Sequence, residues 1–111
     1  QNYVIRTQVS EVILAASGAR TEVAEFAASN GALPGATYTP STTMSDFVDM
    51  LAWNQGTMAI VATSSNAING SQADGMTITL TAAFDASTQQ VTWTCGGNIP
   101  AQFRPGSCQG T

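Results

Sequence analysis

The sequence contains no histidine and no lysine, and only 9% of its 111 residues carry a charged side chain. Histidine is the usual general base near neutral pH and a common metal ligand, and lysine forms Schiff bases with carbonyl substrates. Without these residues, Ser-His and Cys-His nucleophile pairs, histidine-containing metal sites and Schiff-base chemistry lose their usual components. We therefore expect a protein that is not an enzyme, with no catalytic residue, no cofactor and no metal site.

Positive charge and long apolar segments are also scarce. Three basic residues stand against seven acidic ones, and the formal net charge of −4 leaves no basic stripe to neutralise nucleic-acid phosphates. No run approaches the roughly 18 consecutive apolar residues that a membrane-spanning helix needs. Hydrophobic residues still make up 43% of the sequence, which at this length predicts one domain, residues 1–111, with a modest core.

Only two cysteines are present, Cys95 and Cys108, and both lie near the C-terminal end. A metal site would need at least one further cysteine or histidine, and a redox motif would have a gap of two residues, so a disulfide is the favoured interpretation. Closing a loop of this size stabilises a small domain by about 3 kcal/mol in the chain-entropy description. A disulfide also predicts an oxidising compartment.

The first thirty residues have the periodicity of one long amphipathic helix, which we place at about residues 2–29. Asn30-Gly31 and Pro34 mark its end, whereas no capping box marks its start, so we expect the helix to begin upstream of this chain. Val23 and Phe26 are expected to be buried against a sheet, and the turns near Gln1 less so. The apolar stripe consists of Ile5, Val9, Val12, Ile13, Ala16, Val23, Phe26 and Ala27.

Residues 31–56 are predicted to connect the helix to a sheet, with turns at Pro34-Gly35 and Pro40-Ser41. A loop of this length in a small domain is unusual unless it folds locally. Helical spacing within it predicts a short helix of about two turns, capped by Thr43 or Ser45. Its apolar positions are Met44, Phe47, Val48 and Leu51.

From Gly56 onward the hydrophobic period changes from helical to alternating. Three half-buried strands are predicted in GTMAIVATS (56–64), GMTITLTAAF (75–84) and QQVTWTC (89–95), with threonine at most outward positions. Turn-rich segments at 64–74 and 85–89 join them into an antiparallel meander over residues 57–95. One helix and a sheet of three or four strands, each with one apolar face, predict an α+β fold in which the helix lies across the sheet.

Two segments carry a family resemblance. The run QVSEVILAASGARTEVAEFAASNGALP resembles the second half of the N-terminal helix of type IV pilins, which ends at an Asn-Gly stop and a proline. The tail, VTWTCGG followed by two prolines and Cys108, is similar to the last strand and the disulfide-closed C-terminal loop of that family. The order helix, loop, meander and cystine loop also agrees, so the resemblance covers nearly the whole chain.

The resemblance implies a structural subunit of a bacterial type IV pilus. It divides the chain into the C-terminal half of a spine helix (1–30), an αβ-loop (31–56), the sheet (57–95) and the disulfide-bounded loop (95–108). The very hydrophobic first segment of such pilins, with its assembly glutamate, is absent from this sequence, so we expect a soluble, N-terminally truncated head domain that stays monomeric by itself.

Function, partners and location follow from the same resemblance. It implies a homo-oligomeric filament of the full-length form, built by the pilus assembly machinery, with an inner-membrane stage through the missing N-terminal segment and methylation of the subunit. The filament would be extracellular and would support adhesion to a host surface, twitching motility, DNA uptake or phage attachment. The alternative is a minor pilin or a type II secretion pseudopilin that acts as a tip or binding module, although many pseudopilins use calcium and lack this disulfide.

Four aspartates and one glycosylation sequon are the polar site candidates in the sequence. Asp46 and Asp49 are three residues apart, but nothing near them resembles a calcium loop, so we expect a solvated face. Asp74 and Asp85 have the chemistry of strand-connecting turns. The sequon at Asn69-Gly70-Ser71 is a weak signal in a bacterial surface subunit.

Two tryptophans are the remaining candidates. Trp93 shares parity with Val91 and Cys95, so it is expected in the core. Trp53 precedes the turn-forming residues Asn54-Gln55-Gly56, and it is either a core residue or an exposed aromatic that marks a subunit contact.

Overall fold

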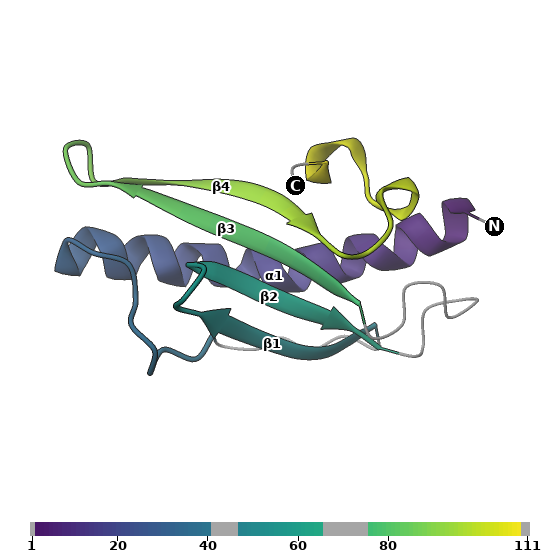
Figure 1. Cartoon of the computed structure of the whole chain (residues 1–111), viewed down its shortest axis with the longest axis horizontal. Helices are drawn as coiled ribbons and strands as arrows, with labels where there is room; N and C mark the ends of the chain where they lie inside the picture. The colour runs from purple at the N-terminus through teal and green to yellow at the C-terminus, as the bar shows by residue number, and fades with distance from the viewer. Residues whose placement is uncertain (1, 41–46, 66–75, 110–111) are drawn as a thin grey trace.

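The computed structural model describes residues 2–40, 47–65 and 76–109, and within them one long helix lies across one face of an antiparallel sheet (Figure 1). The N-terminal half of the helix lies at the end of the molecule that also holds the C-terminal loop. The elements, in chain order, are α1 (Asn2–Asn30), β1 (Val48–Asn54), β2 (Ala59–Ser64), β3 (Thr77–Asp85), β4 (Gln90–Gly97) and the 3-10 turns η2 (Ala101–Phe103) and η3 (Gly106–Cys108).

Helix α1 sets the length of the molecule. Its 29 residues rise about 44 Å at 1.5 Å per residue, and the longest dimension of the molecule is 45 Å. The helix ends where the sequence predicted, because Gly31 has a φ of 72° and its N–H donates to the carbonyl of Ala27 at 2.8 Å. Seven of its apolar side chains are completely buried: Ile5, Val9, Val12, Ala16, Ala19, Val23 and Ala27.

The expected burial along α1 is confirmed at Val23, which is fully covered, and is wrong at Phe26 and in the first turns. Phe26, predicted to be buried, is 39% exposed, because it lies about 60° around the helix axis from Val23 and falls at the edge of the buried stripe. Ile5 and Val9, near the end expected to be less buried, are fully covered. The C-terminal residues around η2 supply that cover, since η2 packs against α1.

The sheet has the order β1-β2-β3-β4, and every neighbouring pair is antiparallel. Ile60, Leu80 and Cys95 lie in one row of the face that meets α1. The opposite face carries threonines from three strands, in agreement with the predicted alternation, because side chains of successive strand residues point to opposite faces. These threonines are Thr63, Thr77, Thr79, Thr81, Thr92 and Thr94.

The predicted short helix is wrong where the structure describes it, because residues 48–54 form strand β1 and pair with β2. The buried residues of β1 are Val48, Leu51 and Trp53. An irregularity in the register between Val48 and Met50 inserts one extra residue, which gives the first two buried positions a spacing of three. That spacing imitates a helical pattern. Thr43, Met44 and Ser45 lie outside the described residues.

Candidate assembly and binding surfaces

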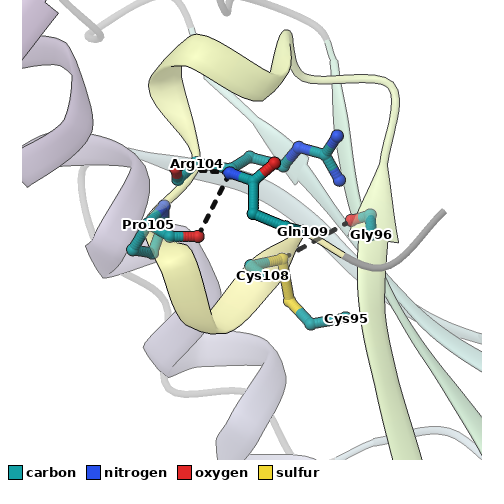
Figure 2. The surroundings of a disulfide bond; sticks show 6 residues. All are labelled: Cys95, Gly96, Arg104, Pro105, Cys108 and Gln109. Atoms are coloured by element: carbon teal, nitrogen blue, oxygen red, sulfur yellow. Dashed lines mark hydrogen bonds between the residues drawn. A yellow bond between two sulfur atoms is a disulfide. The ribbon is translucent and has the colours of Figure 1, made fainter.

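A disulfide closes the C-terminal loop, as the sequence predicted (Figure 2). Cys95 stands opposite Leu80 in the inner row of the sheet, and its sulfur bonds to that of Cys108 at 2.01 Å with the two Cα atoms 4.6 Å apart. Cys108 is fully buried, and its N–H donates to the carbonyl of Pro105 at 2.9 Å in η3. The bond therefore fixes η3 against the end of β4.

Where the loop leaves β4, non-covalent contacts with β3 attach it to the sheet a second time. Gly97 has a φ of 129°, and a Cβ added to it would lie 2.1 Å from the carbonyl oxygen of Thr77, so no other residue fits there. The next residue, Asn98, accepts hydrogen bonds from the Thr77 N–H at 2.6 Å and from the Thr77 hydroxyl at 3.1 Å. Sequence reasoning did not single out Gly97 or Asn98, although the glycine pair directly after Cys95 was a signal for such a close approach.

The same loop holds the N-terminal half of α1. Ile99 and Phe103 are each 1% exposed and belong to the same core cluster as Ile5 and Val9 of the helix. At the surface, Arg6 Nε donates to the carbonyl of Gln102 at 2.6 Å. The buried apolar contacts provide most of the attachment, because a solvent-exposed hydrogen bond exchanges with bonds to water.

A second group of contacts holds the segment after the helix to the C-terminal half of α1. The Tyr38 hydroxyl donates to Glu22 Oε1 at 2.8 Å, and the Tyr38 ring meets the Trp53 ring edge to face with centroids 5.9 Å apart. Trp53 Nε1 donates to the carbonyl of Pro34 at 3.2 Å. Burial, with the adjacent Glu22 carboxylate, raises the pKa of the Tyr38 phenol well above its usual value.

The face of α1 that points away from the sheet keeps two large apolar side chains in solvent. Leu14 is 64% exposed, and Val4 is 42% exposed on the same side of the helix. Gly18 lies one turn after Leu14, and a Cβ built on it meets no atom within 4 Å. Leu14 and Gly18 belong to a series that follows steps of three and four residues, which we call the outer stripe of α1: Val4, Thr7, Glu11, Leu14, Gly18, Thr21 and Glu25.

A search of known families supplies the decisive comparison. The sequence matches the pilin family of bacterial filament proteins over residues 5–109. The chain belongs to the pilin family. This membership confirms the resemblance drawn from the sequence, and it implies a structural subunit that assembles with other pilin subunits into an extracellular pilus filament.

In this pilin the candidate aspartates lie apart or outside the described residues. Asp49 is exposed on β1, while Asp46, Asp74 and the sequon beginning at Asn69 fall outside the described ranges. Asp85 has the turn role that the sequence predicted. Its carboxylate accepts hydrogen bonds from the Ser87 N–H at 2.9 Å and from the Ser87 hydroxyl at 2.6 Å, and these bonds lower the pKa of Asp85.

The two tryptophans have different outcomes. Trp93 is half-buried and packs against the core, in agreement with its parity. Trp53 is only 8% exposed, so the interpretation of this residue as an exposed contact is wrong. Pro34 and Tyr38, from the segment after α1, cover the Trp53 ring. Both residues precede Trp53 in sequence, so the turn that follows Trp53 gave no sign of this cover.

The described part of the pilin offers neither a metal site nor a membrane-crossing helix. Residues 2–40, 47–65 and 76–109 contain no group of three or more histidine, cysteine, aspartate or glutamate side chains placed to hold a metal ion. In the same ranges, α1 lacks the continuous apolar character of a membrane-crossing helix, and no other helix there has the length for one.

Proposed function

We propose that this chain is the head domain, residues 1–111, of the main structural subunit of a bacterial type IV pilus, and that the outer stripe of α1 packs against neighbouring copies. The observation that supports this proposal is the exposure of Leu14, 64%, on a helix whose opposite side is buried from Ile5 to Ala27. A helix fixed so firmly to its sheet presents its outer stripe in a constant orientation, which repeated contacts in a filament require.

The contact proposed for each copy is small. Full burial of a leucine side chain contributes about 1.5–3 kcal/mol, and Gly18 beside it allows a neighbouring backbone to approach closely. Heads of net charge −4 repel one another, although salt screens that repulsion beyond about 10 Å at 0.1 M. We therefore expect the isolated chain to be monomeric, since assembly depends on many such contacts made together.

The test introduces a charge on the outer stripe in cells that lack the chromosomal copy of the gene. Complementation with Leu14→Asp is expected to abolish filaments in electron micrographs, while Gln90→Asp, at an exposed position on β4, is expected to leave them unchanged. Both purified variants should unfold at the temperature of the parent chain. Normal filaments with Leu14→Asp would overturn the role of the outer stripe.

Adhesion, twitching motility, DNA uptake and phage attachment are proposed as functions of the assembled filament, with an inner-membrane stage and subunit methylation before assembly. The chain itself, with three basic residues, is not proposed to bind DNA. Deletion of the gene distinguishes the main subunit from the alternative. Loss of all filaments supports the main subunit, whereas retained filaments with lost function support a minor pilin or a pseudopilin.

A further inference from the structure

An open hollow of about 500 Å³ is lined by residues of the β1–β2 turn and by Ala36 of the segment after α1. Figure 1 shows that this turn lies at the end of the sheet opposite the C-terminal loop. Its lining includes Ala52 and Val61, which are cross-strand partners on the outer face of the sheet. Ala36 and Trp53 provide further apolar lining, and Gln55 lies at the turn. The volume is within the range of about 300–1,000 Å³ that small-ligand sites occupy.

The lining of the hollow is held in place by contacts that need no ligand. Trp53 is fixed by its hydrogen bond to Pro34 and by the edge of the Tyr38 ring. Asn54 Oδ1 accepts hydrogen bonds from the Gly56 N–H at 2.9 Å and the Thr57 N–H at 3.3 Å, which fix the turn. A site whose walls are already ordered loses less conformational entropy when a ligand binds.

The chemistry of the lining selects a class of ligand. Among the residues that the structure describes, none that lines the hollow is charged, so these side chains offer no counter-charge to an inorganic anion or a metal cation. The Gln55 amide both donates and accepts hydrogen bonds, as sugar hydroxyls do, while Asn54 keeps its amide N–H groups as donors because its Oδ1 already accepts two bonds within the turn. Ala52 and Val61 match the apolar C–H face of a sugar ring.

We propose that this hollow binds a neutral saccharide, a pyranose ring with its C–H face toward Ala52 and Val61 and its hydroxyls toward Asn54 and Gln55. The site is separate from the outer stripe of α1, so the assembly contact proposed above does not occupy it. Because the hollow is open to solvent, the affinity expected for one disaccharide is in the millimolar range.

The test is a titration of the ¹⁵N-labelled chain with cellobiose, maltose, lactose and N,N′-diacetylchitobiose, followed by amide chemical shifts. At least one of these sugars is expected to give saturable shifts at residues 52–56, at Val61 and at the Trp53 indole N–H. Gln55→Ala should weaken binding about fivefold, as expected for one lost hydrogen bond. The matched control Gln90→Ala, the same change at an exposed position on β4, should leave it unchanged.

Five results would overturn the proposal. The first four are the absence of saturable shifts with all four sugars, saturable shifts confined to other residues, equal affinity of Gln55→Ala and Gln90→Ala, and binding of the corresponding uronic acid as tight as that of the neutral sugar. A fifth is a dependence of the same signals on protein concentration without sugar, because that result would make a second copy of the chain the occupant.

Discussion

Replacement of Ile5 by alanine tests whether the C-terminal loop really buries the first turns of α1. Ile5 is fully buried, while its neighbour Val4 is 42% exposed. Ile5→Ala removes three carbon atoms, worth about 2.4 kcal/mol at about 0.8 kcal/mol per buried methylene. The cavity left behind adds to this loss, so we expect a decrease of about 3–4 kcal/mol in the free energy of unfolding.

Val4→Ala is the matched control for this change. Both substitutions replace a β-branched residue by alanine in the same helical turn, so both gain the same helix propensity, about 0.5 kcal/mol. Only Ile5 also loses burial in the core. The free energy of unfolding of Val4→Ala should therefore stay within about 0.5 kcal/mol of the parent value.

Urea unfolding with the disulfide intact measures both variants. The midpoint for Ile5→Ala should fall while the dependence of the free energy on urea stays constant, since the surface exposed on unfolding barely changes. A loss below about 1 kcal/mol for Ile5→Ala, or equal losses for the two variants, would refute the reasoning. Either result would show that the loop does not cover the N-terminal half of the helix.

Four further predictions concern other parts of the molecule. Phe103→Ala should cost about 3–5 kcal/mol in urea unfolding, and Phe26→Ala, at a site that is 39% exposed, clearly less. Gly97→Ala should lower the free energy of unfolding by more than about 2 kcal/mol, because the alanine Cβ would overlap the Thr77 backbone of the neighbouring strand. Native mass spectrometry should find no free thiol, and reduction should cost about 3 kcal/mol in the same urea assay. Because the pKa of Tyr38 is raised in the folded state, the unfolded state loses its phenol proton at a lower pH. The contribution of Tyr38 to the free energy of unfolding is therefore fully present below about pH 10 and should fall as the pH rises further. Tyrosinate absorbance should show one tyrosine that titrates later than the other.

The strands after Gly56 were predictable because the alternation of apolar residues and threonines is contained within each strand. Ile78, Leu80 and Ala82 alternate with threonines, and a period of two places each set on one face whatever the partner strand is. The end of α1 was predictable for a similar reason, since Gly31 is a residue that can adopt the left-handed conformation there at low cost.

Strand β1 was not predictable from spacing alone. Its irregular register places Val48 and Leu51 three residues apart and both in the core, and the same spacing fits one face of a helix. Only the pairing with β2 decides between a strand and a helix here. The register of that pairing cannot be read from the residues of either strand alone. The hollow beside Trp53 depends on this strand, so the sequence did not reveal it either.

The burial of Ile5 depends on a contact between the two ends of the chain. Arg6 and Gln102 are 96 residues apart in sequence, and they meet only because the disulfide and Gly97 return the chain from β4 toward α1. Helical periodicity indicated which side of α1 is apolar but not which part of the molecule covers each turn. The prediction was therefore correct about the stripe and wrong about its extent.

The attachments of α1 at both ends determine how a load on the helix reaches the head. Near the N-terminal end the helix is held through Phe103 in a loop that Cys108 closes covalently, and near the C-terminal end Tyr38 bonds to Glu22. A helix held at one end only could peel away one turn at a time, with each step exposing little apolar surface. With both ends held, opening of the helix from either end has to break one of these attachments before the core residues between them are exposed.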